Sequence, residues 1–155
     1  MTPRFKTAVF AGTFNPFTIG HQAIVERALL IFDKVIIAIG HNVNKPADLS
    51  LVKRVEAIGK VFDGNDAVEI TTYSGLTADF VRESGATAIL RGIRNITDFE
   101  YERNLADVNK KILGVDTVFL AADPEHSYIS SSVVRELQAF GHDTSALVPN
   151  AKYKG

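Results

Sequence analysis

The sequence predicts an α/β fold in which a doubly wound, five-stranded parallel sheet is covered by helices on both faces. Five short apolar runs alternate along the chain with segments of helical spacing. The runs are solidly apolar instead of alternating with polar residues, which is typical of strands buried on both faces. A chain of 155 residues, 46% of them hydrophobic, can form one well-buried core but not two ordinary domains. We therefore expect a single domain over residues 1–155, with a poorly fixed tail from about residue 150.

The expected strands are the five apolar runs. They are Thr7–Ala11, Val35–Gly40, Ala67–Thr71, Ala86–Leu90 and Thr117–Ala121. Parallel strands need right-handed crossovers, and the helical segments between the runs supply them. In folds of this kind, ligands bind beyond the carboxyl ends of the strands, near the point where the strand order reverses.

The first two helices are predicted from apolar stripes. The first stripe consists of Ile24, Val25, Ala28, Leu29 and Phe32. The second helix is expected to start at Ser50 and to carry Val52, Val55, Ile58, Val61 and Phe62. A shorter helix is expected over 77–84.

Capping signals indicate the last two helices. Thr97 and Glu100 have the spacing of a capping box. The apolar residues that follow it are Tyr101, Leu105, Val108 and Ile112. Ser130 is a candidate N-cap for a final helix with Val133, Val134, Leu137 and Phe140.

Composition excludes several classes of function. The net charge of −1 argues against a general nucleic-acid-binding protein, which normally has a strong excess of basic residues. The chain has no cysteine, so disulfides, thiolate metal sites and cysteine nucleophiles are excluded. No segment resembles a signal peptide or a membrane span. We expect a cytoplasmic protein without nucleic-acid or membrane partners.

The segment Gly12–His21 carries the strongest indication of function. A strand that breaks at Gly12 and turns into a helix presents free backbone N–H groups to an anion. Gly20 allows a ligand to approach the backbone, and His21 on the first helical turn can direct a ring N–H at a phosphate. The alternative is an ordinary Asn-Pro turn followed by a surface histidine. The chain contains neither a phosphate-binding G-x-x-x-x-G-K-[ST] run nor a G-x-G-x-x-G dinucleotide motif after the strand.

Polar residues follow every predicted strand, where phosphate-binding side chains would meet at one edge of the sheet. In strand order they are Thr13 and His21; His41, Asn42, Asn44 and Lys45; Ser74, Gly75 and Thr77; Arg91 and Arg94; and Ser127 with Ser130, Ser131 and Ser132. This clustering favours a phosphate-handling site over chance placement of loop residues.

Four motifs in order resemble those of one family. Residues 12–16 with Thr18-Ile19-Gly20-His21 resemble the (His/Thr)-x-Gly-His motif of the nucleotidyltransferases. The segments 91–94, 98–102 and 129–132 look like the phosphopantetheine adenylyltransferase branch of that superfamily. The resemblance extends from about Phe5 to Pro149. Asn15 stands where many members carry aspartate, and His126 where an aromatic residue often stacks near the adenine.

The resemblance implies transfer of AMP from ATP to 4′-phosphopantetheine, which gives dephospho-coenzyme A and pyrophosphate in coenzyme A biosynthesis. The nucleophile is already an anion, so positioning and charge stabilisation suffice. By resemblance, His21 is the catalytic residue and stabilises the transition state at the α-phosphate. The residues that would bind phosphopantetheine are Thr13, Lys45, Thr77 and Arg91.

A longer set would bind ATP by the same resemblance. It comprises Thr13, Phe14, His21, Gly92, Ile93, Arg94, Glu102, His126, Ser127, Tyr128, Ile129, Ser130, Ser131 and Ser132. Mg²⁺ is implied as cofactor, held through the ATP phosphates and without a dedicated protein site. A homohexamer is implied as well.

Several alternatives compete with these assignments. Lys45 could be a solvated charge, Glu102 an exposed residue on a charged helix face, and the serines helix caps only. Another superfamily member, such as a nicotinamide mononucleotide adenylyltransferase or a cytidylyltransferase, is disfavoured by Thr18, where those relatives generally carry histidine. A non-catalytic nucleotide or coenzyme A sensor is disfavoured by the presence of His21, Lys45 and Arg91 together.

Overall fold

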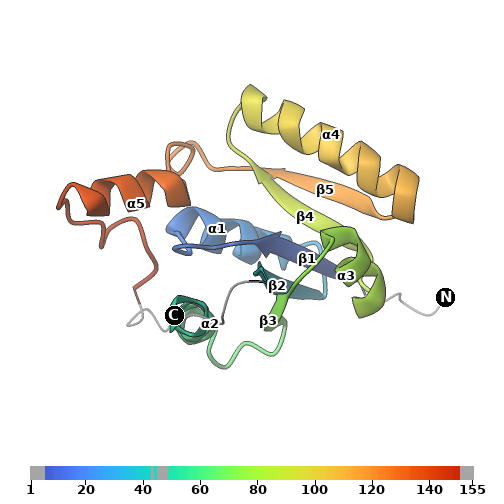
Figure 1. Cartoon of the computed structure of the whole chain (residues 1–155), viewed down its shortest axis with the longest axis horizontal. Helices are drawn as coiled ribbons and strands as arrows, with labels where there is room; N and C mark the ends of the chain where they lie inside the picture. The colour runs from blue at the N-terminus through green and yellow to red at the C-terminus, as the bar shows by residue number, and fades with distance from the viewer. Residues whose placement is uncertain (1–5, 43, 45–48, 151–155) are drawn as a thin grey trace.

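In the computed structural model, which describes residues 6–42, 44 and 49–150, strands and helices alternate along the chain (Figure 1). The strands are β1 (Thr7–Gly12), β2 (Lys34–Gly40), β3 (Val68–Tyr73), β4 (Ala88–Ile93) and β5 (Asp116–Ala121). The helices are α1 (Ile19–Ala28), α2 (Leu49–Val61), α3 (Thr77–Ser84), α4 (Ile96–Leu113) and α5 (Ser131–Ala139). Residues 151–155, on which the tail prediction falls, lie outside the described residues.

The five strands form one parallel sheet in the order β3-β2-β1-β4-β5. This order confirms the predicted doubly wound α/β class. After β3 the chain crosses back to the other side of β1 and continues outward through β4 and β5. The strand order therefore reverses between β1 and β4, and a ligand site is expected beyond the carboxyl ends of these two strands.

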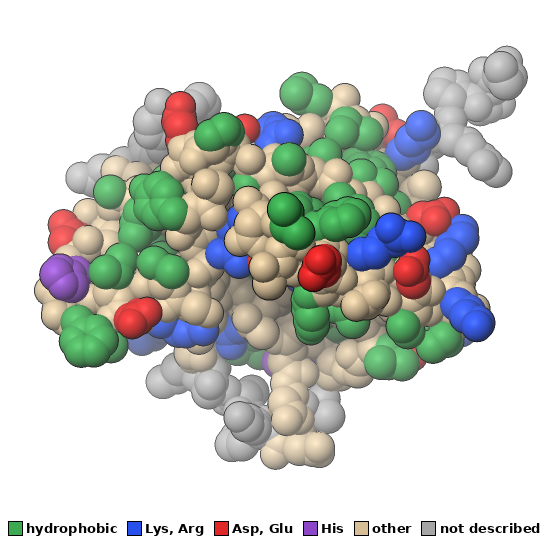
Figure 2. Space-filling view, turned by 90° about the horizontal axis from the view of Figure 1, so that it is seen from above, with side chains coloured by type: hydrophobic (Ala, Val, Ile, Leu, Met, Phe, Trp, Pro, Cys, Tyr) green, Lys and Arg blue, Asp and Glu red, His purple; other side chains and the backbone are tan. Residues whose placement is uncertain are grey.

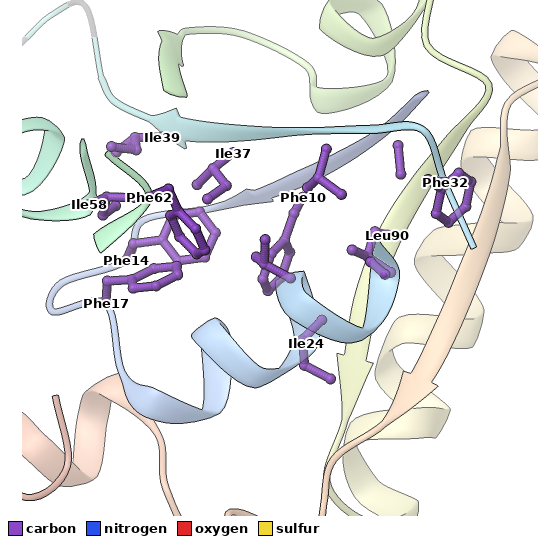
Figure 3. Packing of buried hydrophobic residues seen from close by; sticks show 14 of the residues in the cluster. Phe10, Phe14, Phe17, Ile24, Phe32, Ile37, Ile39, Ile58, Phe62 and Leu90 are labelled. Atoms are coloured by element: carbon purple, nitrogen blue, oxygen red, sulfur yellow. The ribbon is translucent and has the colours of Figure 1, made fainter. Parts of the chain in front are cut away.

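Successive residues of the central strands pack on opposite faces of the sheet, as the pleat requires. On one face, Phe10, Ile37 and Leu90 contact α1 and α2 (Figure 3). On the other face, Val9 and Ile89 belong to a cluster with α3. The central strands are thus apolar on both sides because both sides are covered, which is the arrangement that their solid apolar runs predict.

Strand β4 extends further than predicted. It begins at Ala88 and runs to Ile93, because its pairing with β5 continues to Ile93 and Ala121. Arg91, expected in the loop after this strand, instead lies inside the strand opposite Phe119. Its guanidinium is therefore carried by the sheet and not by a loop.

The predicted capping box of Thr97 and Glu100 is wrong. The N-cap of α4 is Asn95, which has an extended backbone and whose side chain accepts a hydrogen bond from the Asp98 N–H. Thr97 lies inside the first helical turn. Asparagine is as good a cap as threonine, so the spacing pattern alone selected the wrong residue.

Helix α1 ends at Ala28, yet Phe32 in the following turn remains buried as its place in the stripe predicts.

Several apolar residues of the predicted stripes are exposed in the isolated chain. Val52 on α2 and Phe140 after α5 are exposed. The α4 stripe is exposed throughout and consists of Tyr101, Leu105, Val108 and Ile112. Figure 2, a view onto the α4 side, shows hydrophobic side chains gathered on this face. Among the described helices, none is long and apolar enough to cross a bilayer.

Candidate active site

A cavity of about 300 Å³ opens where the sheet splits between β1 and β4. The β1–β4 pairing ends at Phe10 and Leu90, while β4 continues to pair with β5 up to Ile93. Beyond this point the two central strands separate at their carboxyl ends. The cavity occupies the position that the reversal of strand order predicts.

Most of the residues predicted to bind ATP line this cavity. They are Thr13, Phe14, His21, Gly92, Arg94, Glu102, His126, Ile129, Ser130, Ser131 and Ser132. Ile93, Ser127 and Tyr128, which the prediction included, are not part of its lining, and Tyr128 is 64% exposed. Residues from the four predicted motifs therefore meet around one cavity, although β1 and α5 are more than a hundred residues apart in the sequence.

His21 is fixed by the first turn of α1. Thr18 is the N-cap, and its hydroxyl accepts a hydrogen bond from the His21 backbone N–H. In return, the Thr18 backbone N–H donates to Nδ1 of His21 at 2.9 Å. This is a capping box in which histidine takes the place that glutamate usually occupies. The ring cannot turn without leaving a backbone donor of the helix unpaired.

The hydrogen bond from Thr18 defines the tautomer of His21. A backbone N–H can only donate, so Nδ1 carries no proton and the neutral ring bears its proton on Nε2. Burial, reinforced by the positive charges of Arg91 and Arg94, lowers the pKa of His21 to about 4. At neutral pH the cavity therefore contains a neutral Nε2–H donor.

Three phenylalanines hold the imidazole ring of His21. The ring centroid lies 5.0 Å from that of Phe14, 5.3 Å from that of Phe17 and 6.0 Å from that of Phe10. Phe14 has a left-handed backbone with φ of 48°, which is uncommon for a bulky residue, and its ring is buried in this cluster (Figure 3). This aromatic enclosure was not predicted from the sequence, because the three rings come from both a strand and a turn.

Arg91 is held by two partners. Its Nε and Nη2 donate to the two carboxylate oxygens of Glu102 at 2.8 and 2.6 Å. Its Nη1 donates to the carbonyl of Ala11, across the split between β1 and β4. Among the described residues, Glu102 is the only charged one that is buried. Arg91 was predicted to bind phosphopantetheine and Glu102 to bind the nucleotide, and the structure places them in one bidentate ion pair.

Arg94 forms the second ion pair at this edge. Its Nε donates to Asp98 at 2.9 Å and its Nη2 to the other oxygen of the same carboxylate at 3.2 Å. Both residues line the cavity, and both are more exposed than Glu102. The two arginines of β4 and its following loop are thus each paired with a carboxylate of α4.

The serines around the start of α5 have separate roles. Ser130 is the N-cap and accepts from the Val133 N–H. Ser131 donates its hydroxyl to the carbonyl of Pro16, which ties α5 to the first motif. Arg135 also lines the cavity and donates to the carbonyl of Asn15 at 2.6 Å. Arg135 was not among the predicted site residues, although its spacing of four from Ser131 places both on one helix face.

His126 closes the cavity from the loop before α5. Its Nδ1 is buried and has no hydrogen-bond partner among the described residues, since the nearest Asp123 oxygen lies 4.0 Å away.

The residues predicted to bind phosphopantetheine lie around neighbouring cavities. Thr13 lines the main cavity and also a second one of about 400 Å³, together with His41 and Ser74. Arg91 and Thr77 line a third cavity of about 210 Å³ between the sheet and α4. The Thr77 hydroxyl is hydrogen-bonded to that of Tyr73 at 2.8 Å. Lys45 lies outside the described residues.

Carboxylates around the main cavity do not form a ready metal site. Asp98 and Glu102, the two that line it, are each engaged by an arginine. Among the residues that the structure describes, no group of three or more His, Asp or Glu side chains is arranged to hold a metal ion. The residues present therefore do not fit a divalent cation bound by the protein alone, because such a site needs free oxygen ligands.

Comparison with known proteins agrees with this geometry. The family model described as cytidylyltransferase-like matches residues 9–137. A phosphopantetheine adenylyltransferase of Porphyromonas gingivalis is 56% identical over 142 residues, which cover 92% of this chain and 93% of the relative. The enzyme of the same name from Phocaeicola vulgatus is 47% identical, with coverage of 93% and 95%.

Solved structures support the fold. A bifunctional NMN adenylyltransferase/ADP ribose pyrophosphatase from Francisella tularensis, complexed with AMP and a manganese ion, superposes with a TM-score of 0.66 at 18% identity. The match covers 94% of this chain but only 44% of that longer protein. With the fold, the cavity and the relatives in agreement, the chain belongs to the phosphopantetheine adenylyltransferase family of cytidylyltransferase-like nucleotidyltransferases.

Proposed function

We propose that this protein transfers the adenylyl group of ATP to 4′-phosphopantetheine and releases dephospho-coenzyme A and pyrophosphate. The observation that carries the proposal is the neutral Nε2–H of His21 in the cavity at the split of the sheet, beside Arg91 and Arg94. The family relationship, with relatives that are 44–56% identical, supports the choice of acceptor.

The reaction is a single displacement at phosphorus. A phosphate oxygen of phosphopantetheine forms a bond to the α-phosphorus of ATP, and the bond from that phosphorus to the bridging oxygen of pyrophosphate breaks. No proton has to be removed from the nucleophile, so the site needs no general base. What lowers the barrier is alignment of the two phosphates and stabilisation of the charge that accumulates on the α-phosphate oxygens.

His21 is the catalytic residue of the proposal. Its Nε2–H donates to an α-phosphate oxygen, and the Thr18 N–H keeps this donor in place before the substrate arrives. A donor that is already fixed costs no reorganisation at the moment of reaction. The low pKa of His21 means that it acts as a hydrogen-bond donor and not as a proton donor at neutral pH.

The other assignments follow from the cavities that the residues line. Ser131, Ser132 and Arg135 at the start of α5 face the nucleotide, since a helix N-terminus and a cation both favour phosphate. Thr13 lies between the ATP cavity and the neighbouring cavity, and so touches both substrates. Arg91 and Thr77, which line the cavity between the sheet and α4, bind phosphopantetheine. By family resemblance, Lys45 also binds the phosphate of this acceptor.

In this proposal, Mg²⁺ binds to the protein together with ATP. Because Asp98 and Glu102 are engaged by arginines, the ion is expected on the ATP phosphates and water, as is usual for magnesium. A cytoplasmic location is also part of the proposal, supported by the absence of cysteine.

The test is a turnover assay with purified protein, ATP and 4′-phosphopantetheine, in which dephospho-coenzyme A and pyrophosphate are both measured. We expect stoichiometric products with this acceptor. Nicotinamide mononucleotide with ATP and phosphocholine with CTP, which match the alternative superfamily activities, serve as controls. Faster turnover with either control would contradict the assigned substrate.

We also propose that the chain works as a homohexamer, as family resemblance implies. The exposed apolar stripe of α4 supports self-association, because a soluble monomer rarely leaves so many large apolar side chains along one helix uncovered (Figure 2). Light scattering should give a mass six times that of one chain. Val108→Glu on α4 should lower this mass, whereas Phe140→Glu, an equally drastic change at an exposed position after α5, should not. A monomeric parent protein would contradict the proposal.

A further inference from the structure

The turn that follows β1 holds an unfavourable backbone conformation. Phe14 has φ of 48°, in the left-handed region, which is sterically unfavourable for a bulky side chain. Such a conformation persists only where the surrounding structure fixes it, and it often occurs at functional sites. Thr13, the residue before it, lines both substrate cavities.

Two kinds of contact hold this turn. On one side, the Phe14 ring is enclosed by Phe10, Phe17 and His21, with centroids 5.1, 5.5 and 5.0 Å away. On the other side, Arg54 of α2 reaches across and its Nη1 donates to the carbonyl of Thr13 at 2.6 Å. The Nε of Arg54 donates to the Ser50 carbonyl one turn earlier, which fixes the guanidinium on its own helix.

The carbonyl of Thr13 and the N–H of Phe14 belong to the same peptide plane. In a trans peptide these two groups point in opposite directions. When Arg54 holds the carbonyl toward α2, it therefore turns the Phe14 N–H away from α2. Loss of this hydrogen bond would remove one of the two restraints on the orientation of the Thr13–Phe14 peptide.

We propose that Arg54 is a positioning residue for adenylyl transfer: by binding the Thr13 carbonyl, it fixes the Thr13–Phe14 peptide in the orientation that aligns the two phosphates. This inference rests on the proposed function and assigns Arg54 no contact with either substrate. Misplacing reacting groups by about 1 Å can cost on the order of a hundredfold in rate, so the effect of losing Arg54 should fall mainly on kcat.

The test compares Arg54→Met, which keeps the length of the side chain but removes its donors, with Arg54→Lys, which keeps one. Lys53→Met is the matched control, since Lys53 is an exposed cation beside Arg54 on the same helix. We expect Arg54→Met to lower kcat by about tenfold to a hundredfold, with KM for each substrate changed less than about threefold. Arg54→Lys should recover part of kcat, and Lys53→Met should match the parent.

Three results would overturn the proposal. A rise confined to the KM of phosphopantetheine would make Arg54 a direct phosphate ligand. A fall in melting temperature with unchanged kcat per folded molecule would make it merely structural. An equal loss in Lys53→Met would make the effect one of general charge.

A crystal structure of Arg54→Met gives a readout that does not depend on turnover. We expect the Thr13–Phe14 peptide to be rotated, with φ of Phe14 outside the left-handed region. An unchanged peptide would refute the positioning role even if the parent protein used another acceptor. Failure of the parent in the turnover assay, with a rotated peptide in the variant, would refute the proposed function alone.

Discussion

The two halves of the split between β1 and β4 are built in different ways. At the end of β1, His21 is neutral, its tautomer is fixed by a backbone N–H, and its ring is enclosed by phenylalanines. At the end of β4, Arg91 and Arg94 are charged, and each is paired with a carboxylate of α4. The β1 side thus presents a donor that is ready before substrate binds, whereas the β4 side presents charges that already have partners.

This difference separates the roles of the two sides. A preformed neutral donor can act on the transition state without rearrangement. A paired arginine has to share its donors between a carboxylate and a phosphate. Its net contribution to substrate binding is therefore reduced by the part of the ion pair with the carboxylate that is lost. We therefore expect the β1 side to control kcat and the β4 side to control substrate affinity, while both sides contribute to stability.

The largest expected effect is that of His21→Ala. Loss of the Nε2–H donor should lower kcat by about a hundredfold to a thousandfold, because a single transition-state donor typically contributes roughly 3–4 kcal/mol. Affinity for both substrates should remain close to that of the parent. Steady-state kinetics and calorimetric titration of each substrate measure these quantities. A kcat within tenfold of that of the parent would show that His21 does not stabilise the transition state.

The next effect is on stability at acid pH. The pKa of His21 is about 4 in the folded protein, against about 6.5 for an unperturbed histidine. The unfolded chain therefore takes up a proton before the folded protein does. The contribution of His21 to stability is complete above pH 6.5 and is lost as the pH falls to about 4. Over this interval the free energy of unfolding should fall by about 3 kcal/mol because of His21.

Urea unfolding at several pH values measures this contribution. The His21→Ala variant lacks the titrating group and is the control for all other acid effects. The difference in unfolding free energy between parent and variant should shrink as the pH falls from 6.5 to 4. A difference that stays constant over this interval would mean that the pKa of His21 is not depressed.

A smaller effect distinguishes the two arginines of the β4 side. Arg91→Met leaves the buried Glu102 without its partner and should destabilise the fold by about 2–3 kcal/mol. Arg94→Met breaks a more exposed pair with Asp98 and should cost less than about 1 kcal/mol. Replacing Glu102 by Gln in the Arg91→Met background should restore part of the stability. If the two single variants lost equal amounts of unfolding free energy, the difference in burial between the two ion pairs would not determine their contributions to stability.

Much of this arrangement could be predicted from the sequence. The solid apolar runs of β1 and β2 predicted buried parallel strands, and the Gly-Thr-x-Asn-Pro turn with His21 predicted the site at the first strand end. Local patterns were sufficient there, because strand, turn and capping residues are neighbours in the sequence.

Other features depend on contacts that no local pattern contains. The pairing of Arg91 with Glu102 requires β4 and α4 to be placed together, and β4 extends past Leu90 because β5 lies beside it. Asn95 and Thr97 both suit a helix start, and tertiary placement selected Asn95. In the sequence, nothing distinguishes Arg54 and Arg135 from ordinary charged residues on helix surfaces. Only the fold brings them to the carbonyls of Thr13 and Asn15 in the turn after β1.

The central claim is that a neutral His21 presents Nε2–H to the cavity, and nitrogen-15 NMR of the imidazole tests it most directly. Nitrogen chemical shifts distinguish the two neutral tautomers and the protonated ring, and a pH titration gives the pKa. We expect an unprotonated Nδ1 and a protonated Nε2 throughout the neutral range, with protonation of the ring near pH 4. A ring that carries its proton on Nδ1, or that titrates near 6.5, would contradict the account.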